Sequence, residues 1–188
     1  LGHVQAEDGG SVYLRLSTRQ LLQPKRQLSE LHKREIIDGG YWLKPPAAGC
    51  ELAVIAMGAV MPEAIAAWEQ IVEEVPGAGL LAVTSADRLN AEWHAALKGR
   101  QTGRADATCE IERLLAPLAA DAGLVTILDG HPATLSWIGA VRGHRVQALG
   151  VEHFGQSGDL PDLFHKYRLD SGAILDAAAA ALVGRAKG

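Results

Sequence analysis

The chain has 188 residues, of which 48% are apolar and 21% are charged, and its formal net charge is −4. A chain of this length can bury roughly 70% of the surface that its unfolded form exposes, enough for one ordinary domain and a short appendage. The negative charge argues against a general nucleic-acid binder, and no apolar run approaches the ~20 residues that a membrane helix needs.

The two cysteines, Cys50 and Cys109, have neither the spacing of metal ligands nor the density of a secreted disulfide scaffold. We therefore expect a reducing, cytoplasmic location. The chain opens on a polar stretch without an initiator methionine, so we expect no signal peptide there. The same start suggests that the chain is a piece of a longer protein.

The first third of the chain combines turn signals with short periodic segments. Residues 11–17 are rich in β-favouring side chains and are predicted to form a strand. Residues 26–37 are predicted to form a helix that ends at Gly39-Gly40, and residues 41–43 a short strand. The run 44–49 contains two prolines and breaks regular structure, as a loop or a domain boundary does.

From residue 50 onwards, apolar runs alternate with amphipathic segments. The runs predicted as buried strands are residues 52–57, 80–84, 124–128 and 144–150. The segments predicted as helices begin near Pro62, Ser85, Ile111, Pro132, Asp159 and Ser171. Such alternation predicts an α/β fold with three αβα layers, in which helices cover both faces of a mostly parallel sheet of about five strands.

Three local features of this pattern are specific. Residues 98–107 are polar and are predicted to form a mobile surface loop. The helix that follows is predicted to carry apolar side chains from Ile111 to Leu118 on one face. Ser85 and Ser171 are predicted to cap the helices that follow them.

The sequence contains no complete catalytic motif. It has no P-loop, no G-x-S-x-G elbow, no H-E-x-x-H and no G-x-G-x-x-G. The candidates for proton transfer are His131 and His153, because each follows a strand end beside a carboxylate, Asp129 or Glu152. The alternative is that each histidine caps a turn or contacts a partner. A metal site from these four side chains would require the two loops to converge.

Two further features of the sequence could belong to a binding site. Arg15 and Arg19 flank a strand end and could bind a carboxylate or a phosphate, the alternative being a surface ion pair. The polar, glycine-rich loop from Gly150 to Asp159 joins a strand to a helix and is a candidate for the rim of an active site.

Several stretches resemble transketolase-like thiamine diphosphate enzymes, and together they cover essentially the whole chain. Residues 9–20 resemble the last strand of the pyrimidine-binding domain of these enzymes. Residues 51–61 resemble the opening of their third, C-terminal domain. Residues 150–160 and 167–175 are similar to the terminal loop and to the start of the last helix of that domain.

Two short stretches are most similar to one branch of the family. Residues 83–89 and 128–132 resemble the single-chain decarboxylating component of 2-oxo acid dehydrogenase complexes, pyruvate dehydrogenase included. This resemblance implies a parent enzyme that decarboxylates a 2-oxo acid and acylates lipoyl-lysine. The alternatives are a fragment of a transketolase or a deoxyxylulose-phosphate synthase, and a stand-alone interaction domain without catalysis.

The resemblance also implies a domain organisation. Residues 1–25 would be the tail of the pyrimidine-binding domain, 26–49 a linker with a helix and a short strand, and 50–188 the transketolase C-terminal-like domain. Thiamine diphosphate and Mg²⁺ would be bound by the upstream domains of the parent, and the present chain would hold neither a cofactor nor a metal. The loop from Gly150 to Asp159 would then be a structural corner and an interface element.

Roles for individual residues and partners follow from the same resemblance. Arg19 matches the arginine that contacts the sugar phosphate in transketolases, although Thr18 is an extra residue in that motif. No catalytic residue is implied in this chain, which leaves His131 and His153 as weak candidates. The implied partners are a second copy in a homodimer, the upstream domains and the dihydrolipoyl acyltransferase core, with no nucleic acid and no membrane.

Overall fold

The computed structural model describes residues 5–11, 27–153 and 155–185. The strand predicted at 11–17 and the candidates Arg15 and Arg19 fall mainly or wholly in the stretch 12–26, outside the described residues. Within the described part, no helix is both long enough and apolar enough to cross a bilayer.

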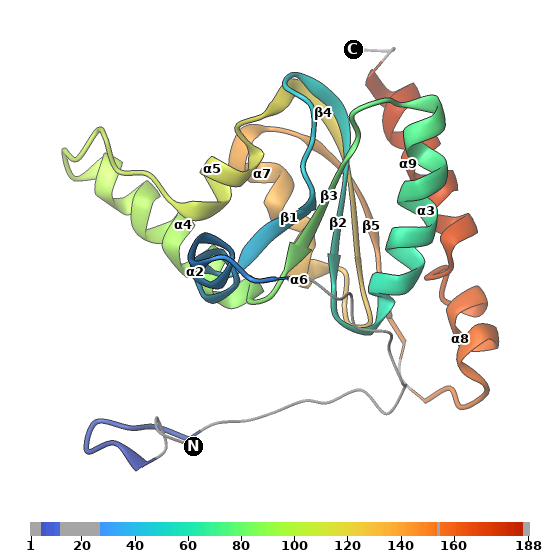
Figure 1. Ribbon diagram of the computed structural model, residues 1–188, viewed down its shortest axis with the longest axis horizontal. Coiled ribbons are helices and arrows are strands. Elements are labelled where there is room, and N and C mark those ends of the chain that lie inside the picture. The colour runs from blue at the N-terminus through green and yellow to red at the C-terminus, as the bar shows by residue number, and fades with distance from the viewer. Residues whose placement is uncertain (1–4, 12–26, 154, 186–188) are drawn as a thin grey trace.

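A five-stranded sheet forms the centre of the molecule (Figure 1). Its strands, in spatial order, are β1 (Gly40–Lys44), β3 (Gly79–Val83), β2 (Cys50–Met57), β4 (Leu118–Leu128) and β5 (Arg145–Leu149). The pairs β2–β3, β2–β4 and β4–β5 are parallel, and only the pair β1–β3 is antiparallel within this sheet. The prediction of a mostly parallel sheet of about five strands is confirmed.

Helices cover both faces of the sheet and complete the three αβα layers (Figure 1). One face is covered by α3 (Met61–Glu74), α8 (Leu160–Lys166) and α9 (Ser171–Arg185). The short 3-10 turn η1 (Gly58–Val60) leads into α3. The other face carries α2 (Glu30–Asp38), α4 (Ala86–Gln101), α5 (Glu110–Leu115), α6 (Ala133–Ser136) and α7 (Ile138–Arg142). The predicted α/β class is therefore confirmed.

Strand β2 shows why the apolar runs become central strands. Ala53 and Ile55 point into one buried cluster, and Leu52, Val54 and Ala56 point into the other. All five are fully buried, because side chains alternate between the two faces of a strand and helices cover both faces. Burying each large aliphatic side chain contributes about 1.5–3 kcal/mol, so this strand anchors both halves of the core.

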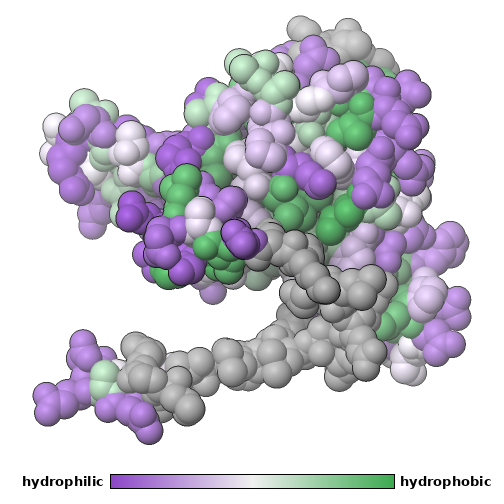
Figure 2. Space-filling model, viewed as in Figure 1, coloured by the Kyte–Doolittle hydropathy of each residue, from purple (hydrophilic) through white to green (hydrophobic). Residues whose placement is uncertain are grey.

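Helix α4 is longer than the sequence predicts. Residues 98–101, expected to belong to a mobile loop, form its last turn, and only residues 102–109 lie between α4 and α5. Arg100 in that turn donates hydrogen bonds to the Ala107 carbonyl and to the Glu112 carboxylate, which hold the helix end in place. This end projects from the sheet and carries mostly hydrophilic or neutral residues, which explains the polar sequence (Figures 1 and 2).

The predicted helix that reaches Leu118 is also wrong at its end. Helix α5 stops at Leu115, and Leu118 begins strand β4. Pro117 has no amide hydrogen and so cannot continue a helix, and its carbonyl accepts a hydrogen bond from Gly49 at 2.8 Å. This contact pairs Leu118 with Cys50 and starts β4 six residues before the predicted strand.

The two predicted helix caps have different outcomes. The Ser85 hydroxyl accepts a hydrogen bond from the Arg88 amide, so Ser85 caps α4 as predicted. At α9 the predicted cap Ser171 is wrong, because the Oδ1 atom of Asp170 accepts from the Ala173 amide at 2.8 Å. The cap of α9 therefore lies one residue earlier in the chain.

Candidate functional site at the carboxyl edge of the sheet

The carboxyl ends of β2, β4 and β5 lie next to one another. Met57 pairs with Leu128, and Ile127 pairs with Leu149, so the segments that begin at Gly58, Asp129 and Gly150 leave the sheet at the same edge. Ligands of open parallel sheets usually bind at such an edge. It is therefore the first place to look for a functional site.

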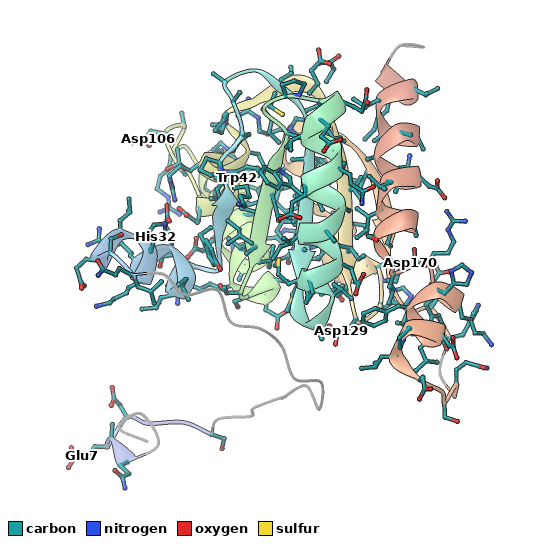
Figure 3. All side chains as sticks on the ribbon, turned by 45° about the vertical axis from the view of Figure 1, so that its right-hand side comes forward. Glu7, His32, Trp42, Asp106, Asp129 and Asp170 are labelled. Carbon is teal, nitrogen blue, oxygen red and sulfur yellow. The ribbon has the colours of Figure 1, made fainter. Side chains whose placement is uncertain are left out.

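Gly58 and Asp129 are in direct contact at this edge. Gly58 has a φ angle of +84°, and a Cβ atom built on it would overlap Oδ1 of Asp129. Asp129 lies at the edge of the sheet where α3 begins (Figure 3). The carboxylate therefore packs against the backbone of the turn, where it leaves no space for even a methyl group.

The loops after β4 and β5 converge, as a metal site built from their side chains would require. The Val151 amide donates a hydrogen bond to the Gly130 carbonyl at 2.8 Å. A Cβ atom on Gly150 would lie 2.5 Å from that carbonyl oxygen and 2.9 Å from the Pro132 nitrogen. Backbone packs on backbone here, so glycine is required at position 150.

His131 caps a turn in this structure. Its Nδ1 atom accepts a hydrogen bond from the Ala133 amide at 3.2 Å, and its side chain is exposed. Capping of a turn is the alternative to proton transfer that the sequence analysis gave for this histidine. It uses the lone pair of Nδ1 locally and leaves Nε2 as the ring atom that can face solvent.

His153 lies in the loop from Gly150 to Asp159, which is held to helix α8. The hydroxyl of Tyr167 donates to the His153 carbonyl at 2.9 Å, while the His153 side chain is exposed. Lys166 donates to the side-chain oxygen of Gln156 at 2.6 Å. Lys166, the last residue of α8, and Tyr167, which follows it, therefore hold the loop at two points.

The side chains of His131, His153, Asp129 and Glu152 do not form a metal site. Across the described ranges, no three side chains of histidine, cysteine, aspartate or glutamate lie close enough to hold a metal ion. Gly58 contacts the Asp129 carboxylate, and Gly150 contacts the backbone at Gly130 and Pro132, so these strand ends pack directly against one another. The described residues present no ligand set for the Mg²⁺ that accompanies thiamine diphosphate.

A charged cleft lies among helices α2, α4, α5 and α7 and was not expected from the sequence. Its volume is about 850 Å³, and its lining residues are Asp38, Glu92, Arg100, Thr108, Cys109, Glu110, Glu112, Arg113, Val141 and Arg142. Arg100 binds Glu112, and Arg113 binds both Glu110 and Glu35. These ion pairs join α4 to α5, and α5 to α2, which is distant from both in sequence.

Two groups in this cleft have shifted pKa values. The hydrogen bond from Arg100 lowers the pKa of Glu112, which therefore stays ionised at neutral pH. Burial raises the pKa of the Cys109 thiol, which disfavours the reactive thiolate. Both effects point to a structural network, since a nucleophilic cysteine needs the opposite shift.

The sequence also did not predict that a histidine is buried. His144 is 6% exposed, and its Nδ1 atom lies 3.2 Å from the Ala122 carbonyl, which accepts its proton. Burial lowers its pKa, so the ring is neutral at pH 7. Its Nε2 atom and the Thr126 hydroxyl have no hydrogen-bond partner among the described residues. The sequence placed His144 at the start of a strand and gave no sign of its burial.

Comparisons with known proteins identify the fold. No protein-family model and no curated protein matches the chain. Transketolase from Leishmania mexicana is a structural neighbour with a TM-score of 0.56 and 14% identity, and the match covers 79% of this chain and 18% of that one. A variant of Pichia stipitis transketolase gives a TM-score of 0.55, 19% identity and coverages of 86% and 20%.

A third neighbour is a split-gene transketolase described as an inactive β4 tetramer. Its TM-score is 0.50 at 15% identity, and the match covers 78% of this chain and 43% of that one. The chain thus spans about a fifth of the single-chain transketolases and less than half of the split one. At these identities the likeness establishes the fold alone: the chain has an α/β fold that it shares with part of these transketolases.

Proposed function

We propose that this chain is an assembly domain of a thiamine diphosphate-dependent enzyme, whose cofactor is bound by other domains. The observation that carries the proposal is the match of most of this chain to about a fifth of each single-chain transketolase. The same fold thus occurs as one part of a larger enzyme. The carboxyl edge supports the same division of labour, because no three metal-ligating side chains come together among the described residues.

The domain boundaries belong to this proposal. Residues 1–25 are assigned to a preceding domain, 26–49 to a linker and 50–188 to the assembly domain. The linker includes β1, which pairs with β3 and so forms one edge of the sheet. Arg19 is proposed to bind a substrate carboxylate or phosphate in the parent enzyme, and His131 and His153 to have structural or accessory roles.

For the parent reaction we favour a 2-oxo acid dehydrogenase of the pyruvate type, on the resemblance of residues 83–89 and 128–132. Such an enzyme decarboxylates a 2-oxo acid and passes the acyl group to lipoyl-lysine. Its cofactor supplies the electron sink for decarboxylation. A transketolase is the second candidate, because the solved structures that share this fold are transketolases. A non-catalytic interaction domain is the third.

The parent reaction is tested on the full-length protein that contains this chain. A 2-oxo acid dehydrogenase should reduce ferricyanide when it is given pyruvate and thiamine diphosphate, with no turnover of xylulose 5-phosphate. Ketol transfer from xylulose 5-phosphate would establish the transketolase alternative. Absence of both reactions and of cofactor binding would leave the interaction domain.

The division of labour is tested on the chain itself. Isothermal titration of the 188-residue chain with thiamine diphosphate and Mg²⁺ should give no binding heat. Micromolar binding would refute the proposal that other domains hold the cofactor.

Self-association and location complete the proposal. We propose that the chain pairs with a second copy, since a split-gene transketolase with a similar fold is described as a tetramer. Multi-angle light scattering should give a mass near twice that of one chain. Docking of an acyltransferase core is proposed for the 2-oxo acid parent only. A cytoplasmic location is proposed because Cys50 and Cys109 are buried, unpaired thiols.

A further inference from the structure

The sheet ends in two edge strands, β1 and β5, which differ in how they are protected. Within the described part of the chain, each of them has a neighbouring strand on one side only. An edge strand presents backbone N–H and C=O groups that can pair with a strand of another chain. Natural proteins therefore usually guard such an edge with a bulge, a lysine, a proline or a covering element.

Strand β1 has these guards. Its register with β3 shifts between Trp42 and Lys44, as a β-bulge would cause, and Pro45 and Pro46 follow directly. Proline has no amide hydrogen and cannot extend a ladder of hydrogen bonds. Helix α2 also packs against β1. This edge of the sheet therefore disfavours a further strand.

Strand β5 has none of these guards. Its register with β4 is regular throughout, and residues 145–149 contain neither lysine nor proline. Ala148 is exposed, and Val146 and Gln147 are half-buried, although helices lie on both faces of the sheet. Strand β5 is thus a regular and accessible edge, and its length is ordinary for a strand of a globular protein.

The helices beside β5 also leave its edge open. On α9, a Cβ atom built on Gly184 would lie 3.5 Å from Nη1 of Arg145, so this side of the helix faces β5. Ala180 lies one turn earlier on the same side and is exposed. On the other face of the sheet, Gly139 of α7 packs on the Val146 side chain. The residues that flank β5 at these contacts are small, so they leave room for a strand to approach.

The two ends of β5 carry opposite charges. Arg142 and Arg145 lie at its start, and Glu152 follows its end. All three side chains are exposed, and none of them forms an ion pair within the described ranges. A parallel copy of β5 would place arginine beside arginine. An antiparallel copy places the basic start of each strand beside the acidic end of the other, which is electrostatically complementary.

The side chains of β5 also match an antiparallel copy of themselves. When the pairing is centred on Gln147, Val146 lies opposite Ala148 of the second copy, which combines a larger and a smaller apolar side chain on the α7 face. Arg145 lies opposite Leu149 of the second copy on the α9 face, where its methylene groups can cover the leucine. Gln147 meets its own copy, and each amide can both donate and accept a hydrogen bond.

We propose that a second copy of this chain adds its β5 antiparallel to this β5 and joins the two five-stranded sheets into one continuous sheet. We call this contact the β5 interface. A two-fold axis passes beside Gln147, so both copies contribute the same surface and every contact occurs twice. The inference rests on the self-association proposed above and adds the strand, the direction and the register through which it occurs.

The test places charges at the two-fold axis of the 188-residue chain. Gln147→Lys and Gln147→Glu should each raise the dissociation constant of the dimer by about tenfold or more, because each puts like charges opposite one another. An equimolar mixture of the two variants should form mixed dimers again, because opposite charges then meet. Gln101→Lys, the same change at an exposed position of α4, is the matched control and should dimerise as the unchanged chain does. Analytical ultracentrifugation measures all four samples.

A cross-link tests the register without adding charge. Directly opposite residues of an antiparallel pair have Cα atoms about 4.5–5.5 Å apart, a distance that a disulfide spans. Mild oxidation of Gln147→Cys should therefore give a covalent dimer on a non-reducing gel. Gln101→Cys should remain a single chain, and so should the unchanged protein, whose two cysteines are buried. Circular dichroism checks that every variant is folded.

Three results would overturn the β5 interface. A dimer that persists in both charged variants, without a cross-link in Gln147→Cys, would leave self-association intact and assign it to another surface. A chain that is monomeric at every concentration measured would contradict the self-association proposed above as well. Dissociation by both charged variants that mixing does not reverse would show that Gln147 does not face its own copy.

Discussion

Arg100 and Glu112 form a two-point ion pair that fixes the end of helix α4 against α5. Nη2 of Arg100 lies 2.6 Å from Oε1 of Glu112, and Nη1 lies 3.1 Å from Oε2. Nη1 also donates to the Ala107 carbonyl at 2.7 Å. One side chain thus ties down both ends of the segment that separates the two helices.

Replacement of Arg100 by methionine should loosen the end of α4. We expect faster amide hydrogen exchange in residues 98–104, with the rest of the chain unchanged, because local openings of a helix end need not unfold the core. Lys98→Gln, in the same exposed turn, is the control and should leave exchange unchanged. Equal protection in both variants would show that the ion pair does not hold this helix end.

The same pair should depend on pH in a defined direction. The hydrogen bond from Arg100 lowers the pKa of Glu112 below the ordinary value of 4.5. The stabilisation is therefore complete above pH 4.5 and is lost as pH falls through the lowered pKa. Exchange in the last turn of α4, corrected for intrinsic rates, should rise only below about pH 4.5 in the unchanged chain and should show no such step in Glu112→Gln.

Replacement of Gly58 by alanine should destabilise the fold by about 1–3 kcal/mol, through an unfavourable positive φ and overlap with Asp129. Gly143→Ala is the matched control: φ is +77° there, and a Cβ atom would meet nothing within 4 Å. It should cost only the conformational part, about 1 kcal/mol. Urea denaturation measures both, and equal losses would show that the contact with Asp129 is unimportant.

His144 should make stability depend on pH near neutrality. Burial, assisted by Arg142, lowers its pKa against the opposing effects of the Ala122 carbonyl and Asp121. The unfolded chain therefore binds the proton more tightly, so stability is complete above about pH 6.5 and falls as pH drops from there towards the folded-state pKa. The slope contributed by one site is at most about 1.4 kcal/mol per pH unit.

The variant His144→Asn separates this contribution from those of the other histidines. Its amide can donate to the Ala122 carbonyl as Nδ1 of His144 does, but it does not titrate. Urea denaturation between pH 5 and 8 should show a smaller slope in the variant. An unchanged slope would mean that His144 accepts a proton in the folded state.

Trp42 should anchor the edge strand β1. Its Nε1 atom donates to the Leu114 carbonyl at 3.0 Å, and its ring packs so closely on Gly79 that a Cβ atom there would lie 2.6 Å from it. Trp42→Phe should cost about 1–2 kcal/mol, because the carbonyl in α5 loses its partner. Trp93→Phe should cost less in the same denaturation experiment, because the Trp93 indole forms no hydrogen bond within the described part of the chain.

The layered fold could be predicted because its signal is local. A strand buried on both faces needs a continuous apolar run, and β2 and β3 have one. The start of β4 could not be predicted, since Ala119, Ala120 and Ala122 favour helix over strand, and the strand begins at Leu118 because that residue pairs with Cys50. Tertiary contact there overrides local preference.

The candidate site divides in the same way. The sequence left open whether the loops after β4 and β5 converge, because it does not fix which strands are neighbours; the pairing of β4 with β5 brings the two loops together. The close contacts at Gly58 and Gly150 depend on atomic distances, which no periodicity reveals. The ion pair between Arg100 and Glu112 likewise joins residues on two elements, and the polar residues around Arg100 favoured a loop.

The antiparallel direction of β1 decides at which edge of the sheet helix α2 ends. Gly40 pairs with Val83, the last residue of β3, so the chain enters the sheet at its carboxyl edge. The Gly39 carbonyl accepts from the Thr84 and Ser85 amides, and the Thr84 hydroxyl donates to the Ile36 carbonyl, which fixes the end of α2 at that edge. Helix α2 therefore ends at the side of the sheet that carries Gly58 and Asp129, so an antiparallel edge strand brings a helix end to the same edge as the carboxyl ends of the parallel strands.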